Sequence, residues 1–176
     1  PPPYSSAASD VYKRQVDGSV IKTGADTIHA KNHSDVTIDN KGTISASTNQ
    51  AINMQHAVNT TVTNSGTIEA TLRNAILMDG DNADNNTINN SGTLKAGKKQ
   101  VILATNSENT TIINSGSIET TNSSNPNTGG INYYNTSGAA INGATITNSG
   151  TIFAHGTGIR FGTQGIASKA VNNMTI

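Results

Sequence analysis

The stretch TNSGTIEA, residues 63–70, decides the fold because close copies of it recur along the chain. The copies are DNKGTISA from residue 39, NNSGTLKA from 89, INSGSIET from 113 and TNSGTIFA from 147. Their shared asparagines stand at positions 40, 64, 90, 114 and 148, so the steps between them are 24, 26, 24 and 34 residues. A repeat of about 20 to 50 residues is typical of solenoids, in which each repeat stacks on the last. The sequence therefore predicts a solenoid.

Within each repeat the apolar residues alternate with polar ones, which indicates strands rather than helices. Around the copy at residues 63–70, the even-numbered positions include Val62, Ile68 and Ala70, whereas the odd-numbered positions hold Thr, Ser and Glu. A further apolar run follows eight residues after the motif's Ile or Leu. Those runs are centred on Ile28, Ile52, Ile76 and Ile102, with one around Ile159 that comes a residue early. Each repeat is therefore expected to supply three short strands.

The predicted fold class is all-β, a right-handed parallel β-helix with about 24 residues and three short strands per coil. Coils should lie about 4.8 Å apart, the usual spacing of hydrogen-bonded strands. Equivalent residues then form columns, and one coil alone could not bury its own apolar side chains. The predicted core stack is Val20, Ile44, Ile68, Leu94, Ile118 and Ile152. A second inward column is expected at Ile38, Val62, Ile88, Ile112 and Ile146.

The recurring Asn-x-Gly phrase is interpreted as a corner between two strands. Asparagine tolerates the left-handed backbone of a tight corner, and stacked asparagine amides can hydrogen-bond from coil to coil. The glycine two residues later relieves backbone crowding at the bend. The sequence thus predicts a structural asparagine ladder. Its members are Asn40, Asn64, Asn90, Asn114 and Asn148.

Composition excludes several classes of protein. Aromatic residues are only 3% of the chain, and both Trp and Cys are lacking, so a globule packed on aromatic side chains is not expected. Charged residues are 12% and the formal net charge is zero, which leaves no electrostatic footprint for nucleic acid or an anionic membrane. No apolar run of about 18 residues predicts a membrane-spanning helix. No cofactor is expected.

The first fifteen residues are set aside from the fold. SSAASDVYKRQ, residues 5–15, resembles the translation of a transposase adapter used in sequencing libraries. The repeat begins in mid-phrase directly after it, and Ile176 occupies the position two residues before a motif asparagine. We therefore expect residues 16–176 to be a piece of a longer β-helix. An isolated piece with open strand edges is expected to associate end to end.

Two repeats are longer than the others. The second, from Asn64 to Asn90, has two extra residues, which fall within positions 79–86, and the fourth, from Asn114 to Asn148, has ten, which fall within 121–143. Insertions in a solenoid usually protrude as loops. Either Ile131 or Ile141 supplies the third strand of the fourth repeat, and Ile131 divides the excess more evenly.

Three sets of side chains are candidates for a binding site. Asp79, Asp81 and Asp84 offer oxygen ligands to Ca²⁺, although they match only part of a calcium loop and a solvated acidic turn is the simpler reading. Tyr133 and Tyr134, if exposed, offer rings for a sugar or protein contact; alternatively they fold back over the solenoid. The histidines do not predict zinc, because no third or fourth ligand joins the neighbouring pair His33 and His56. The remaining two are His29 and His155.

Enzymatic and ice-binding functions find little support in the residues. The outward column beside the motif contains Glu69, Lys95 and Glu119, which we interpret as alternating charges on a solvated ladder rather than a catalytic carboxylate pair. Thr-x-Thr ranks such as Thr61 with Thr63 are interrupted in other repeats, where Asp, Asn or Ile replaces the second Thr. No catalytic residue is assigned.

The repeated NSGTI phrases on a period near 24 residues resemble the passenger regions of bacterial autotransporters, and more loosely filamentous haemagglutinin-type adhesins. The resemblance covers residues 16–176 and implies a bacterial surface-attached or secreted right-handed β-helix. It implies a structural and adhesive module without enzymatic activity, whose partners are glycans or proteins of host surfaces, neighbouring cells or matrix. The segment itself is not expected to contact a membrane. The alternative is a piece of a β-helical polysaccharide lyase or hydrolase.

Overall fold

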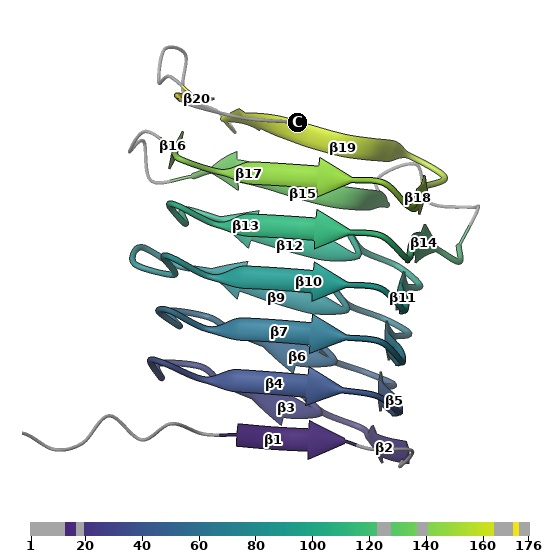
Figure 1. Cartoon of the computed structure of the whole chain (residues 1–176). Helices are drawn as coiled ribbons and strands as arrows, with labels where there is room; N and C mark the ends of the chain where they lie inside the picture. The colour runs from purple at the N-terminus through teal and green to yellow at the C-terminus, as the bar shows by residue number, and fades with distance from the viewer. Residues whose placement is uncertain (1–12, 17–19, 123–127, 137–140, 164–170, 173–176) are drawn as a thin grey trace, which may run out of the picture.

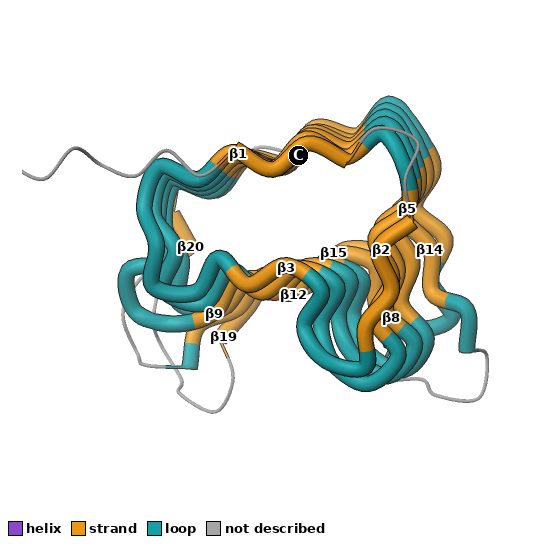
Figure 2. The backbone as a smooth tube through the Cα atoms, turned by 90° about the horizontal axis from the view of Figure 1, so that it is seen from below, coloured by secondary structure: helices purple, strands orange, loops and turns teal. Residues whose placement is uncertain are grey.

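The computed structural model describes residues 13–16, 20–122, 128–136, 141–163 and 171–172. The chain winds upward through a stack of coils in a right-handed sense (Figure 1). Viewed along the axis, successive coils lie over one another (Figure 2). Three parallel sheets run the length of the stack, which confirms the predicted all-β parallel β-helix with three strands per coil. Within the described ranges, no helix has the length and apolar character needed to cross a membrane.

The first sheet contains the strand that ends at each motif asparagine. From β4 onward its strands begin with Thr and end with the motif Asn, and they pair in register. Steps of 24, 26, 24 and 34 residues separate them, as the repeat predicts. Its strands are β1 (Lys13–Val16), β4 (Thr37–Asn40), β7 (Thr61–Asn64), β10 (Thr87–Asn90), β13 (Thr111–Asn114) and β17 (Thr145–Asn148).

The second sheet follows the corner, and the third sheet closes the coil. The second consists of β2 (Val20–Thr23), β5 (Thr43–Ala46), β8 (Thr67–Ala70), β11 (Thr93–Ala96), β14 (Ser117–Thr120) and β18 (Thr151–Phe153). The third consists of β3 (Ile28–His29), β6 (Ile52–Asn53), β9 (Ile76–Asp79), β12 (Ile102–Thr105), β15 (Gly129–Asn135) and β19 (Thr157–Thr163). A separate pair is formed by β16 (Ile141–Asn142) and β20 (Val171–Asn172).

The core is a set of vertical files of aliphatic side chains inside the coil. Ile44, Ile68, Leu94 and Ile118 pair in successive strands and are 0% exposed. The columns through Val62 and through Ile76 are buried in the same way. A fully buried side chain of this size contributes about 1.5 to 3 kcal/mol. Because the coils above and below supply most of that cover, each coil depends on its neighbours.

The N-terminal end differs from the sequence prediction at Val20. Strand β2 aligns Ile21 with Ile44 and places Val20 opposite Thr43, so Val20 does not belong to the core stack. The reason is turn length. Three residues separate β1 from β2, whereas two separate β4 from β5, and the extra residue shortens the register step from 24 to 23. Val20 and Ile21 are adjacent and both β-branched, so residue type alone does not indicate which of them aligns with Ile44.

Residues 13–15, which were set aside with the adapter-like segment, form strand β1 together with Val16. Their backbone pairs in parallel with β4, so that Val16 lies opposite Asn40. Strand pairing uses main-chain groups, which every residue except proline carries in full, so an open sheet edge accepts many sequences.

The long insertion, residues 121–143, is not one protruding loop. Its centre is strand β15, and Ile131 of that strand pairs with Ile102 below and Ile159 above. Ile131 is therefore the third-strand residue, whereas Ile141 belongs to β16, outside the three long sheets. The extra residues are divided between the connection from β14 to β15 and the connection from β15 to β16. Residues 123–127 and 137–140 of these connections, and Ile176, lie outside the described residues.

Candidate functional site

The motif asparagines form a continuous hydrogen-bonded ladder along the stack. Asn40 donates its Nδ2 to Oδ1 of Asn64 at 2.6 Å, and three further bonds of 2.7 Å continue the chain through Asn90 and Asn114 to Asn148. The first four asparagines are only 0 to 2% exposed. In such surroundings a polar side chain must be hydrogen-bonded to be tolerated. The ladder ties each corner to the next.

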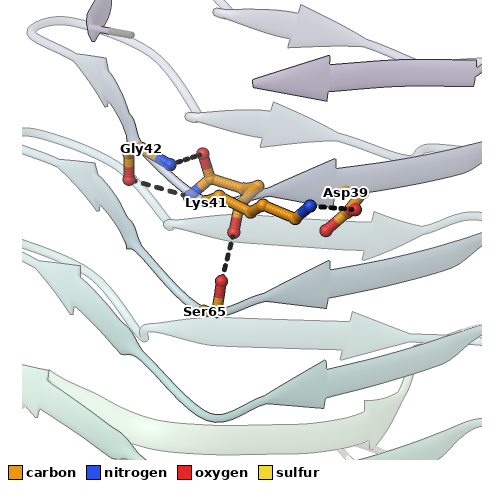
Figure 3. A network of polar contacts seen from close by, with 5 residues as sticks. Asp39, Lys41, Gly42 and Ser65 are labelled. Atoms are coloured by element: carbon orange, nitrogen blue, oxygen red, sulfur yellow. Dashed lines mark hydrogen bonds and ion pairs between the residues drawn. The ribbon is translucent and has the colours of Figure 1, made fainter. Parts of the chain in front are cut away.

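Each rung is also bound to the main chain of its own and the following coil. The Nδ2 of Asn64 lies 3.2 Å from the carbonyl oxygen of Gly66 and 3.2 Å from that of Thr93 in the next coil. Figure 3 shows the equivalent corner one coil earlier, where Gly42 and Ser65 hydrogen-bond around Asn40. On the solvent side of the same corner, Lys41 Nζ lies 3.9 Å from Asp39 Oδ2.

The corner glycines stack so closely that no side chain fits between them. A Cβ at Gly92 would lie 2.2 Å from the carbonyl oxygen of Gly66, and one at Gly116 would lie 2.1 Å from that of Gly92. The same approach recurs at Gly66 and Gly150, with 2.0 and 2.1 Å. The predicted role of this glycine in relieving crowding is therefore confirmed.

The left-handed backbone that we expected at the motif asparagines is located elsewhere. These asparagines end extended strands, and the positive φ values belong to the connection from the third sheet to the first. Two columns of such residues occur there, joined from coil to coil by backbone hydrogen bonds. One column is Asn32, His56, Gly80 and Asn106, and the other is Asp35, Asn59, Asn85, Asn109 and Gly143. Short polar side chains and glycine tolerate this conformation best.

Asn86 is a buried polar residue that sequence reasoning missed. It is 0% exposed, donates Nδ2 to the carbonyls of Ala57 and Ala83 at 2.8 Å, and accepts the amide of Thr60 at 2.9 Å. The register between the left-handed columns places the two extra residues of the second repeat just before it, between Gly80 and Asn85. Asn86 thus supplies the hydrogen bonds of this widened turn. In the sequence, this role is indicated only by the position of Asn86 directly after Asn85.

The three aspartates proposed as calcium ligands do not converge. Asp84 accepts the amide of Glu108 in the next coil at 2.7 Å, and Asp79 accepts the side chain of Gln55 in the previous coil at 3.4 Å. Asp81 is exposed between them. Among the described residues, no three acidic or histidine side chains gather as a metal site. The two carboxylates are engaged by different coils, so the calcium candidate is not supported by this geometry.

Tyr133 is a core residue rather than an exposed binding residue. Its ring is 0% exposed and lies 6.0 Å from that of Phe161 in the next coil. Its hydroxyl donates to the carbonyl of Ser107. Burial raises the pKa of the Tyr133 phenol, and the neighbouring hydroxyls of Thr110 and Ser107 partly oppose that rise. The expectation of an exposed tyrosine pair is wrong for Tyr133, whereas Tyr134 is half-buried beside it.

The raised pKa of Tyr133 predicts a specific loss of stability in alkali. A folded-state pKa above the unfolded value near 10 means that the contribution of this group is complete below about pH 10 and is lost as pH rises further. We expect Tyr133→Phe to lower the free energy of unfolding by about 1 kcal/mol at pH 7. This difference should shrink above pH 10 in urea unfolding. Tyr134→Phe is the control, and identical pH profiles for the two variants would contradict the assignment.

All four histidines are exposed, and the described structure places no metal ligand set around them. Nδ1 of His155 and the hydroxyl of Thr120 form a hydrogen bond of 3.1 Å. The imidazole also meets the ring of Phe153 edge-on, with the two ring centroids 5.1 Å apart. The imidazole of His56 occupies the space that a side chain at Gly80 would need.

The outward column of the second sheet has the register that the sequence predicts. Ser45, Glu69, Lys95, Glu119 and Phe153 follow one another in paired positions. Lys95 Nζ lies 2.6 Å from Glu119 Oε1, and both side chains are about a third exposed. Surface pairs of this kind contribute about 0 to 1 kcal/mol. This arrangement is that of a solvated charge ladder.

From β4 to β17 the outward face of the first sheet carries a threonine on every strand. The column consists of Thr37, Thr61, Thr87, Thr111 and Thr145, all half-exposed and in register. The neighbouring column is mixed, with Asp39, Thr63, Asn89, Ile113 and Thr147. The interruption expected from the sequence is therefore present in space.

Comparison of the chain with protein-family models, with curated proteins and with solved structures finds no match. The described residues contain a regular buried ladder, solvated outer faces and one aromatic core insertion. The ladder consists of side-chain hydrogen bonds that join one coil to the next, which is a structural role.

Proposed function

We propose that the chain is a structural and adhesive module, a stretch of stalk from an autotransporter-like bacterial surface protein. The observation that supports this proposal best is the continuous ladder from Asn40 to Asn148, which joins five coils through buried side-chain amides. Because every coil is hydrogen-bonded both through its strands and through its corner, the stack resists bending and sliding. A stiff rod of this kind is suited to holding a contact site away from a cell.

Recognition is assigned to the long insertion of the fourth repeat. Its two connections flank β15, which is anchored in the stack by pairing with β12 and β19. The strand therefore anchors the described residues at each end of the insertion, Gly129 and Asn135, in the stack. Connections positioned by a rigid scaffold are the usual location of binding residues. The partners proposed are glycans or proteins of host surfaces, neighbouring cells or matrix, and the proposed location is the bacterial surface.

The proposal does not include catalysis. Glycoside hydrolysis ordinarily needs two carboxyl groups, one on each side of the scissile bond. In the column considered, Glu119 is paired with Lys95 and lies two coils from Glu69. No specific contact of the described residues favours the polysaccharide lyase or hydrolase alternative, and depolymerisation assays on acidic glycans separate the two functions.

The adhesive function can be tested by displaying the chain on bacteria through an outer-membrane anchor and measuring attachment to immobilised matrix proteins and glycans. One variant replaces residues 123–127 and 137–140 with Gly-Ser segments of equal length. The control replaces 47–49, an exposed turn of an ordinary repeat. We expect attachment to fall at least tenfold in the first variant only, with unchanged circular dichroism. Equal attachment by all three, or depolymerisation of a glycan, would refute the proposal.

A further inference from the structure

Positive side chains gather on the turns that lead from the second sheet to the third. The turns 71–75 and 97–101 have equal length, and the strands that flank them pair in register, β8 with β11 and β9 with β12. Arg73 therefore lies one coil below Lys99, about 4.8 Å away along the stack. We call the exposed cations of these two turns the basic flank. They are Arg73, Lys98 and Lys99.

The cations of the basic flank repel one another. Like charges at neighbouring positions cost stability, and elsewhere the chain places opposite charges together, as at Lys95 and Glu119. In the described part of the chain, no carboxylate lies within ion-pair distance of Arg73 or Lys99. Among these residues, ion pairing within one copy therefore does not offset the repulsion.

Negative side chains gather on the turns that lead from the third sheet to the first. Asp79, Asp81 and Asp84 lie at the end of β9 and in the turn after it. Glu108 lies in the equivalent turn after β12. Asp81 is exposed, and the other three accept hydrogen bonds from amide groups, which leave the carboxylate charge in place. We call these four residues the acidic flank.

The two flanks border the outer face of the third sheet at the same height. Figure 2 shows the turn after β8 and the end of β9 on opposite sides of the middle of this sheet, and both lie on its outer side. The coil that carries Arg73 also carries Asp81. The next coil carries both Lys99 and Glu108. Each of these two coils thus has a positive turn at one side of the sheet and a negative turn at the other.

The outward column of the third sheet holds leucine at these same two coils. Leu77 pairs with Leu103, and each follows an inward Ile of the core. Leu103 is half-buried, and Leu77 is 6% exposed. The adjoining members of the column, Asn53 and Asn132, are polar. The apolar part of this outer face therefore coincides with the two charged flanks.

We propose that two copies of this chain associate face to face through their third sheets, with their axes parallel and a two-fold axis between them. The basic flank of each copy then faces the acidic flank of the other at the same height, and the contact occurs twice. An antiparallel pair would place basic flank against basic flank. The formal net charge is zero, so the copies do not repel each other as whole molecules. The inference goes beyond the proposed function, because it needs no host partner and uses only coils in the middle of the stack.

Sedimentation and cross-linking of the complete chain test this contact. We expect association that weakens as salt rises from about 0.01 M to about 1 M, because the Debye length falls from about 30 Å to about 3 Å. In a mixture of isotopically labelled and unlabelled chain, a carbodiimide should join lysines of the basic flank to carboxylates of the acidic flank in peptides of mixed label. Mixed-label cross-links that avoid both flanks would overturn the proposal.

Matched variants separate this contact from a simple effect of net charge. Arg73→Gln combined with Lys99→Gln should weaken association at least about tenfold. The control combines Lys41→Gln with Lys95→Gln, which removes the same charge from the corner after the first sheet and from the outward face of the second. Association of the control should equal that of the parent chain.

Exchange of charge between the two flanks within one chain gives the decisive comparison. The exchanged chain combines Arg73→Glu, Lys99→Glu, Asp81→Lys and Glu108→Lys, which keeps the net charge at zero, and it should associate again. A chain with the last two changes alone should not. Circular dichroism verifies that each variant is folded. The proposal is overturned if the parent chain is monomeric at low salt, if the control weakens association as much as the test pair, or if the exchanged chain is folded but monomeric. The display experiment changes neither flank, so adhesion and association fail separately.

Discussion

Asn90→Leu is expected to cost roughly 3 to 5 kcal/mol in the free energy of unfolding. The leucine has nearly the same size, so the loss comes from hydrogen bonds rather than from a cavity. It removes the acceptor of Asn64 Nδ2 and the donor to Asn114 Oδ1, both at 2.7 Å and both in buried surroundings. The measurement is chemical denaturation of the complete chain, followed by circular dichroism.

The control for Asn90→Leu is Asn148→Leu, the same substitution at the exposed end of the ladder. Asn114 loses one acceptor there but still donates to the carbonyls of Gly116 and Thr151. We expect a cost of about 1 kcal/mol. If both variants lost the same small amount, the ladder would not be a stabilising element, and the physical basis of the stiff stalk would be wrong.

Gly92→Ala is expected to have an effect of similar size for a different reason. The new Cβ would stand 2.2 Å from the carbonyl oxygen of Gly66 and 2.6 Å from the carbonyl carbon of Ser65, both main-chain atoms. Neither can move aside as a side chain would, so two coils must separate locally. We expect a loss of roughly 3 to 5 kcal/mol, or failure of the coil that contains β10 and β11 to stack on the coil that contains β7 and β8.

The control is Gly158→Ala, because a Cβ at Gly158 meets nothing within 4 Å. In a strand this change should be close to neutral, since alanine restricts the unfolded chain more than glycine does. Thermal melts of both variants beside the parent chain make the comparison. A Gly92→Ala chain as stable as the parent would show that the corners do not pack as closely as described.

These two effects explain how a chain with few aromatic residues forms an ordered rod. The interior supplies one aliphatic file per sheet, and the corners supply hydrogen bonds and close backbone contact that repeat at every coil. Stability in such a stack is carried mainly by contacts between neighbours. For that reason a change at a middle rung should exceed the same change at an outer rung of the ladder.

Several elements of this protein could be predicted from the sequence because they depend only on periodicity. Alternation of period two predicts strands, and a period near 24 residues predicts their stacking. Once coils stack, equal letters such as Asn64 and Asn90, or Ile68 and Leu94, must lie over one another. The ladder, the core column from Ile44 to Ile118 and the charge column through Lys95 follow from that register alone.

The sequence by itself determined the repeat, the strands and the columns; the tertiary structure decided everything that depends on how a turn is spaced or closed. Turn length placed Ile21 rather than Val20 opposite Ile44. The path of the connection from the third sheet to the first placed the left-handed residues at Asn59 and Asn85, away from the motif. Pairing of β15 with β12 turned Tyr133 into the core. The physical reason is that periodic side chains specify which residues align, whereas the backbone path between strands fixes where the others point.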